Sequence, residues 1–173
     1  MTLYEFIDSA MRRQREITGR QLSYLELGTQ DGGSADAALK SGTVDMAVLI
    51  DTWGEDYGGT NRGSPDFVIQ RLGAELMRNT IILTGDTKTI APLIAHKFDV
   101  IFVDADHSEA GCLADMENAL KLLCENGMLL VDDTDHPVHT YIRNIAMELA
   151  KSHSLEICFH DAHFGLAELR RKQ

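Results

Sequence analysis

Short apolar runs alternate with helix-like segments along most of the chain, and each of the first five runs ends at or close to an acidic residue. The runs have the length and apolar character of buried strands, and the segments between them repeat apolar side chains at helical spacing. Strands are predicted at residues 22–27, 44–50, 81–83, 99–103 and 128–131, and helices at residues 2–18, 33–42, 65–77, 88–96, 108–123 and 137–152. Asn126-Gly127 is expected to close the fifth of these helices.

Five strand-then-helix units in series predict a parallel sheet, because parallel neighbours need a crossover long enough to hold a helix. Strands that are apolar on both sides predict helices on both faces of that sheet. The last two predicted strands, 155–160 and 164–169, are joined by three residues, so they must pair as an antiparallel hairpin. The sequence therefore predicts a three-layer, Rossmann-like α/β fold with five parallel strands and a C-terminal antiparallel hairpin.

The length of 173 residues predicts one domain, 1–173, with a short N-terminal helix in residues 1–20 and the core in residues 21–173. The net charge of −11 argues against a nucleic-acid partner, which would need a basic face. No apolar stretch approaches the roughly 20 residues that cross a bilayer, so no membrane partner is expected. Three widely spaced cysteines and the absence of a signal-peptide pattern predict a cytoplasmic protein.

A glycine-rich turn, residues 28–34, follows the first predicted strand. Glycine permits a positive φ and lets a ligand approach main-chain N–H groups without a Cβ in the way. The turn contains Gly28, Gly32 and Gly33, a spacing that departs from the G-x-G-x-x-G pattern of dinucleotide sites. This departure argues against a nicotinamide-dependent oxidoreductase. A plain strand-to-helix turn is the alternative to a cofactor site.

Acidic residues also follow the second and third predicted strands, at Asp51 and Asp86. Open α/β sheets bind ligands beyond the carboxyl ends of their strands. A carboxylate at the end of the second strand can accept both hydrogen bonds from a ribose diol. A helix cap or a solvated turn residue is the alternative at each of the two positions.

Three aspartates follow the fourth and fifth strands: Asp104, Asp132 and Asp133. Carboxylates that converge are costly unless a cation neutralises them, and Mg²⁺ prefers such oxygen ligands. His107 lies three residues past Asp104, where an imidazole of near-neutral pKa can act as general base on a hydroxyl. The alternative is that Asp106 caps the next helix, His107 is solvated and the two later aspartates only shape a turn.

The glycine-rich turn resembles the first motif of the class I S-adenosylmethionine-dependent methyltransferases, E-x-G-x-x-x-G-x-S, and the resemblance extends from Leu22 to Arg171. It implies a methyltransferase sheet and S-adenosylmethionine as cofactor. The residues it assigns to the cofactor are Glu26, Gly28, Gln30, Gly32, Ser34, Asp51, Asp86, Thr87 and Asp104. Of these, the turn residues would surround the methionine moiety and ribose, Asp51 would hold the ribose, and Asp86 and Thr87 would flank adenine.

The later acidic motifs resemble the metal motifs of the catechol and caffeoyl-CoA O-methyltransferases. The resemblance implies Asp104, Asp132 and Asp133 as ligands of Mg²⁺ or another divalent cation, with Asp104 acting in catalysis. Where those families place a lysine base, this chain has His107, as in bacterial enzymes that methylate sugar hydroxyls on antibiotics. His107 is therefore expected to be the general base.

The function that the resemblance implies is methyl transfer from S-adenosylmethionine to a hydroxyl of a small molecule, assisted by a metal. Two alternatives are a metal-independent methyltransferase acting on another acceptor and a non-catalytic S-adenosylmethionine-binding domain. Relatives carry further N-terminal helices that cover the acceptor site, whereas about twenty residues precede the first strand here. A homo-oligomer could complete the acceptor pocket, and His136 and His139 are further candidates for substrate contact.

Overall fold

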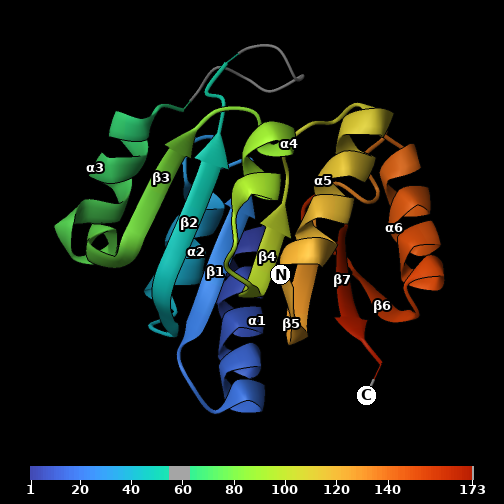
Figure 1. The fold of residues 1–173 in the computed structure, drawn as a ribbon, viewed down its shortest axis with the longest axis horizontal. Helices are drawn as coiled ribbons and strands as arrows, with labels where there is room; N and C mark the ends of the chain where they lie inside the picture. Colours follow the sequence, from blue (N-terminus) through green and yellow to red (C-terminus); the bar gives the residue numbers. More distant parts are fainter. Residues whose placement is uncertain (55–62, 173) are drawn as a thin grey trace.

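A mixed sheet of seven strands forms the centre of the structure, a computed structural model that describes residues 1–54 and 63–172 (Figure 1). The strand order is β3-β2-β1-β4-β5-β7-β6; the first five of these strands are parallel, and β7 is antiparallel to both β5 and β6. The strands are β1 (Leu22–Leu27), β2 (Val44–Asp51), β3 (Thr80–Thr84), β4 (Phe98–Val103), β5 (Leu123–Val131), β6 (Leu155–His160) and β7 (Leu166–Arg171). The predicted fold class is confirmed.

Helices cover both faces of the sheet (Figure 1). They are α1 (Leu3–Thr18), α2 (Gly33–Lys40), α3 (Pro65–Leu76), α4 (Thr87–Ile90), α5 (Glu109–Leu122) and α6 (Tyr141–Ser152), with short 3₁₀ turns η1 (Met77–Asn79) and η2 (Ala91–Leu93). One apolar core joins the sheet to α5 and α6, and a second joins it to α1, α2 and α3. Among the residues described, no helix has the length and apolar character needed to span a membrane.

Local sequence signals account for where several helices begin. The hydroxyl of Thr2 accepts a hydrogen bond from the Glu5 N–H while the Glu5 carboxylate accepts one from the Thr2 N–H, which is the capping box of α1. Ser64 caps α3, whose first residue is Pro65, and Ser108 caps α5. The two parallel strands β1 and β4 are buried along their whole length, as their apolar runs predicted.

The fifth strand differs from the prediction. β5 starts at Leu123, so Asn126-Gly127 lies inside the strand and the prediction that it closes a helix was wrong. Pairing passes from Phe98 with Leu123 to Val100 with Met128, so the extra residues of β5 form a bulge opposite β4. The irregularity interrupts the pairing with β4 without ending the strand, which the local sequence does not reveal.

Two helices are shorter than predicted. The segment expected as one helix at 88–96 divides into α4 and η2, because Pro92 lacks the N–H that a continuing helix needs. α6 begins at Tyr141 rather than near Pro137, because the Nδ1 of His136 accepts hydrogen bonds from the N–H groups of Val138 and His139 and holds a turn there. The loop predicted at 51–63 falls largely outside the described residues.

The carboxyl ends of β2, β1, β4 and β5 are joined beyond the strands themselves. The N–H of Gly28 donates to the carbonyl of Ile50, that of Asp104 donates to Leu27, and that of Asp132 donates to Val103. The acidic strand ends are therefore fixed side by side along one edge of the sheet.

At this edge the main chain of Gly28 passes very close to the main chain of Asp104 and Ala105. Its φ is +89°, and a Cβ on it would lie 2.0 Å from the carbonyl oxygen of Asp104 and 2.6 Å from the Cα of Ala105. Both conflicting atoms belong to the main chain and cannot rotate away. The start of the glycine-rich turn thus needs glycine for its backbone conformation and for the passage of β1 beside β4.

We expect Gly28→Ala to lower the free energy of unfolding by about 3 kcal/mol or more, because left-handed strain adds to a main-chain overlap. Gly19→Ala is the matched control: Gly19 also has a positive φ, +67°, but nothing lies within 4 Å of its missing Cβ. That variant should lose only about 1 kcal/mol. Urea unfolding of both variants tests the difference, and equal losses would show that the approach to Asp104 costs nothing.

Candidate active site

The carboxylate of Asp51 ties the glycine-rich turn to the end of β2. Its Oδ2 accepts the N–H of Gln30 at 2.7 Å and its Oδ1 accepts the N–H of Trp53 at 2.6 Å, while the Trp53 indole donates to the Gln30 carbonyl at 3.0 Å. Gln30 and Trp53 have φ values of +48° and +49°, a region that few side chains favour. Asp51 thus stabilises two unusual backbone conformations at the strand ends. Its predicted contact with a ribose stays a prediction.

Glu26 is fully buried near the end of β1. Its Oε1 accepts a hydrogen bond from the Ser34 hydroxyl at 2.9 Å, and its Oε2 accepts one from the Tyr24 hydroxyl. In the described part of the chain no lysine, arginine or histidine pairs with it. Burial raises the pKa of Glu26 to about 8. The carboxyl therefore binds a proton at neutral pH.

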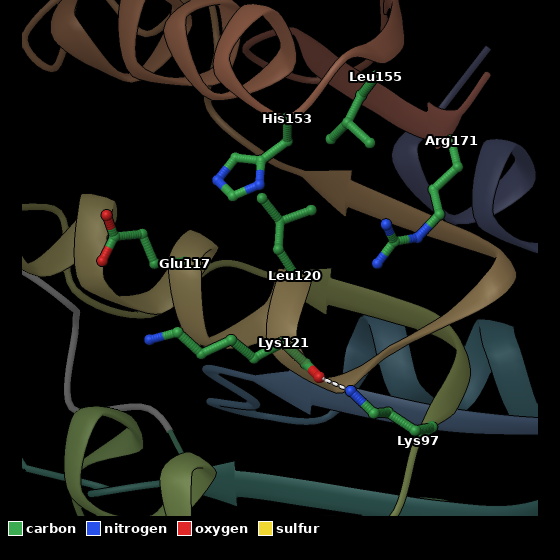
Figure 2. A pocket seen from close by; sticks show the side chains of 7 residues that line it. All are labelled: Lys97, Glu117, Leu120, Lys121, His153, Leu155 and Arg171. Atoms are coloured by element: carbon green, nitrogen blue, oxygen red, sulfur yellow. Dashed lines mark hydrogen bonds between the residues drawn. The ribbon is translucent and has the colours of Figure 1, made fainter.

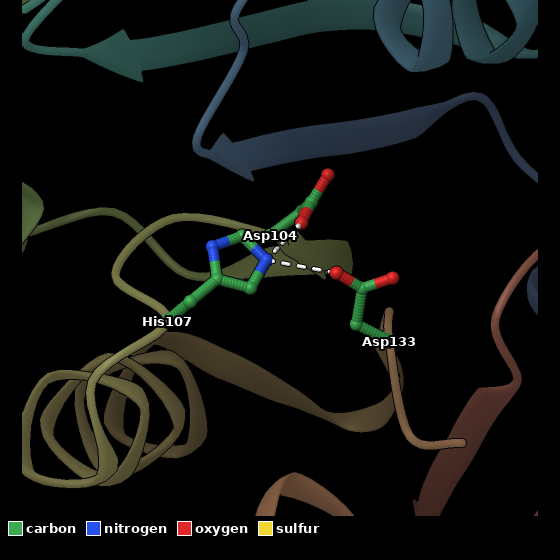
Figure 3. A group of neighbouring side chains, drawn as sticks. All are labelled: Asp104, His107 and Asp133. Atoms are coloured by element: carbon green, nitrogen blue, oxygen red, sulfur yellow. Dashed lines mark hydrogen bonds and ion pairs between the residues drawn. The ribbon is translucent and has the colours of Figure 1, made fainter. Parts of the chain in front are cut away.

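Asp104, His107 and Asp133 meet where β4 and β5 end (Figure 3). The Nε2 of His107 lies 3.3 Å from Asp104 Oδ1 and 2.9 Å from Asp133 Oδ2. Asp133 has a φ of +59°, so its backbone is held in the left-handed region to present this carboxylate. The structure thus brings the predicted base together with two of the three predicted metal ligands.

Asp132 and Asp133 form a second acidic group with His163, a residue of the turn between β6 and β7. The Nδ1 of His163 lies 3.8 Å from Asp132 Oδ2 and 3.6 Å from Asp133 Oδ1. The ligand atoms of this group lie within 4.8 Å of one another, as do those of Asp104, His107 and Asp133. Each of the two groups therefore contains two of the predicted aspartate ligands and a histidine.

Burial and contact with His107 shift the pKa values of the groups in this cluster. Hydrogen bonds to Asp104 and then to Asp133 raise the pKa of His107 to about 10. Burial, together with repulsion from Asp104 and Asp133, raises the pKa of Asp132 well above its usual value. Although burial opposes it, the hydrogen bond from His107 lowers the pKa of Asp133. The imidazolium of His107 thus supplies the positive charge that the carboxylates require.

Two buried carboxylate oxygens in this cluster have no hydrogen-bond partner. They are Oδ1 of Asp132 and Oδ1 of Asp133, and both are inaccessible to solvent. An unpaired buried acceptor costs free energy, so these atoms mark a position that suits a cation or a donor. This is an observation of the structure that fits the predicted metal site.

A series of rings lies beside the acidic cluster. His139 lies 5.1 Å from His107 and 4.7 Å from His136, measured between ring centroids, and His136 lies 4.9 Å from Phe164. The ring of Phe164 is also 4.4 Å from that of His163. These flat faces form a wall at the edge of the site, on the side of β5 and β7.

The predicted adenine residues both make contacts with the protein. Asp86 caps α4 by accepting the Lys88 N–H, and the Lys88 ammonium lies 3.1 Å from Asp86 and 2.8 Å from Asp106. The hydroxyl of Thr87 donates to Asp115 at 2.6 Å, in the interior. Their cofactor roles stay predictions, and any contact from Thr87 would have to come from its main chain or its methyl group.

Two residues near the site were not predicted from the sequence. His163 reaches the acidic cluster because β7 pairs with β5, so the turn before β7 returns to the end of β5. Tyr4 of α1 lies against the start of α2, where a Cβ on Gly33 would be 2.4 Å from its hydroxyl. Neither residue carries a local sequence signal, because both positions depend on which elements are neighbours.

The sequence of the chain matches a known family, and its fold matches several solved structures. A family model described as a methyltransferase domain matches residues 25–134, more than half of the chain. Comparison of the sequence with those of curated proteins finds no match.

Three solved structures illustrate the likeness of the fold. The O-methyltransferase NovP is 15% identical, with a TM-score of 0.76 over 98% of this chain and 79% of that one. The O-methyltransferase TomG from Streptomyces achromogenes, involved in tomaymycin synthesis and solved with S-adenosylmethionine, is 18% identical, with a TM-score of 0.74 over 98% and 79%. A putative caffeoyl-CoA O-methyltransferase from Staphylococcus aureus is 16% identical, with a TM-score of 0.72 over 98% and 82%.

The buried proton of Glu26 gives a pH dependence that Glu26→Gln should remove. Because the pKa of Glu26 is higher in the folded than in the unfolded chain, its stabilising contribution is fully present at low pH and is lost as pH rises through about 8. We therefore expect Glu26→Gln to gain stability relative to the unmodified protein between about pH 5 and pH 9. Urea unfolding across this range is the measurement. Parallel pH profiles for the two proteins would contradict the assignment.

Proposed function

The chain belongs to the methyltransferase domain family, as the resemblance of its sequence predicted, and we propose that it transfers the methyl group of S-adenosylmethionine to a hydroxyl of a small molecule. The observation that carries the proposal is the contact of His107 with Asp104 and Asp133 at the strand ends. That contact fixes the imidazole of the candidate base and a candidate cation site beside the glycine-rich turn. NovP and TomG, which have this fold, are described as O-methyltransferases.

The residues at this edge suit a cationic cofactor. Asp51 and Asp104 lie at the ends of β2 and β4, on either side of β1, and the described residues pair neither of them with a lysine or arginine. S-adenosylmethionine carries a positively charged sulfonium, and its methyl group is already electrophilic. The protein then has to align the acceptor oxygen with that methyl group and to remove the hydroxyl proton.

The acidic cluster supports a divalent cation as the second cofactor. Asp104, Asp132 and Asp133 would hold it, and the unpaired Oδ1 atoms of Asp132 and Asp133 are the observation that fits. A bound divalent cation lowers the pKa of a hydroxyl that coordinates it. His163 is a further ligand candidate on the opposite side of Asp133.

His107 is proposed as the general base, acting through Nε2. That atom is held between Asp104 and Asp133, so the same hydrogen bonds that fix the ring also favour its protonated form. Loss of either bond lowers the pKa of His107, so that a larger fraction of the ring is unprotonated at neutral pH and Nε2 is available to accept a proton. The base role therefore requires that Asp104 and Asp133 bind the metal ion instead of His107, as the metal proposal implies.

The ring wall beside the cluster supports a small acceptor. His136, His139 and Phe164 offer flat faces next to His107, where a bound molecule can present a hydroxyl to Nε2. A homo-oligomer that completes the acceptor site and a cytoplasmic location stay predictions.

Titration calorimetry with S-adenosylmethionine and S-adenosylhomocysteine tests the cofactor. We expect both to bind with micromolar dissociation constants, because methyl donor and product share the adenosine and amino-acid groups. Asp51→Asn should weaken both by about tenfold, since it removes the carboxylate at the predicted ribose contact. Absence of binding to the unmodified protein would remove the proposed function altogether.

A set of aspartate variants tests the metal. Asp133→Asn should reduce methyl transfer to a screened hydroxylated acceptor by at least about a hundredfold, with cofactor binding nearly unchanged. The matched control is Asp135→Asn, which alters an exposed aspartate that pairs with Arg143 outside the cluster. Calorimetry should show a Mg²⁺ or Mn²⁺ heat that Asp133→Asn abolishes and Asp135→Asn keeps. Full activity in EDTA would favour the metal-independent alternative, and cofactor binding without any turnover would favour a non-catalytic domain.

A further inference from the structure

A cavity lies at the opposite edge of the sheet from the candidate active site. It has a volume of about 490 Å³, within the usual range of small-molecule sites. The cavity is bounded by α5, by the end of α6, and by residues next to or within β4, β6 and β7 (Figure 2). Its lining residues are Lys97, Glu117, Leu120, Lys121, His153, Leu155 and Arg171.

The side chains around the cavity are mainly basic, whereas the chain as a whole is acidic. The whole sequence has 27 acidic residues against 16 lysines and arginines. Around this cavity Lys97, Lys121 and Arg171 stand against one acid, Glu117. An excess of cations around one concave site on an acidic protein raises the local concentration of anions.

In the described part of the chain these cations also have no carboxylate partner. Elsewhere in residues 1–54 and 63–172, ion pairs with carboxylates engage Arg12, Arg13, Arg20, Lys40, Arg71, Lys88, Arg143 and Arg170. No such pair within those ranges involves Lys97, Lys121 or Arg171. Lys97 donates instead to the main-chain carbonyl of Lys121 (Figure 2).

Helix ends explain some of these cations but not all of them. α5 and α6 both end beside the cavity, and the carboxyl end of a helix favours nearby positive charge. This accounts for Lys121, and through its hydrogen bond for Lys97. Arg171 comes from the end of β7, opposite Leu155 of β6, and lies in no helix. Its position at the cavity is therefore not explained by the carboxyl end of a helix.

The cavity also offers an apolar surface. Leu120 of α5 and Leu155 of β6 are 7% and 6% exposed, and both line it. A ligand that fills the cavity can bury carbon atoms against these leucines while its charged group contacts Arg171 and Lys97.

We propose that this cavity binds a small organic anion, a carboxylate or phosphate group carried on an apolar body. Its place at the amino-terminal ends of the strands separates it from the acidic edge proposed for methyl transfer. The site is therefore independent of the proposed function.

Amide chemical-shift mapping by two-dimensional NMR tests the site with three probes: hexyl phosphate, hexanoate and neutral hexanol. We expect the two anions to shift the amides of the lining residues, with binding that weakens as salt is added. The tighter of the two identifies the preferred head group. Equal shifts with hexanol, or shifts confined to other parts of the chain, would overturn the proposal.

Variants make the test quantitative. Arg171→Gln should weaken anion binding about three- to tenfold, and Glu117→Gln should tighten it about threefold, because one removes an attractive charge and the other a repulsive one. Arg78→Gln is the matched control, since Arg78 is exposed on η1 away from the cavity. Equal affinities in all three variants would contradict the proposal. The Glu117→Gln result keeps it testable even if Arg171→Gln fails to fold.

Discussion

Parallel pairing of β1 with β2 on one side and β4 on the other is the constraint on which the rest of the structure depends. It aligns the carboxyl ends of neighbouring strands, and main-chain hydrogen bonds from Gly28 and Asp104 continue that alignment past the strand ends. The approach is close enough that residue 28 has no room for a Cβ. Every acidic side chain of the candidate active site is positioned from this edge.

The cost of this arrangement is electrostatic. Asp104, Asp132 and Asp133 are brought together with little solvent around Asp132, and their mutual repulsion favours a proton or a cation. His107 supplies positive charge in the structure as described, since its ring lies between Asp104 and Asp133. Buried Glu26 resolves the same problem differently, by binding its own proton. An edge with these properties suits a cationic cofactor and a metal ion, which is the basis of the proposed function.

The two edges of the sheet have opposite character. At the carboxyl ends of the strands acids predominate, whereas the cavity at the amino ends is lined by lysines and an arginine that pair with no acid among the described residues. Helix direction contributes to this difference, because the helices that follow parallel strands run back and place their carboxyl ends at the amino edge. Arg171 adds to that trend from the last strand, so the C-terminal hairpin helps to form both the anion cavity and, through His163, the acidic site.

The sequence by itself determined the elements and the edge at which the acids gather. Continuous apolar runs, the capping signals at Thr2, Ser64 and Ser108, and crossovers long enough to hold a helix indicate parallel strands, and an acid that directly follows such a strand must lie at its carboxyl end. Asp51 and Asp104 could be located in this way, because the argument needs only their own neighbours along the chain.

Only the tertiary structure decided which side chains meet. His163 reaches Asp133 because β7 lies between β5 and β6, and strand order is a property of long-range pairing. Asn126-Gly127 became a bulge because β4 offered a partner beyond it. The protonation of Glu26 and the gathering of cations around the anion cavity likewise depend on burial and on distances between distant segments. Local sequence cannot encode these, since such energies arise only when the elements pack together.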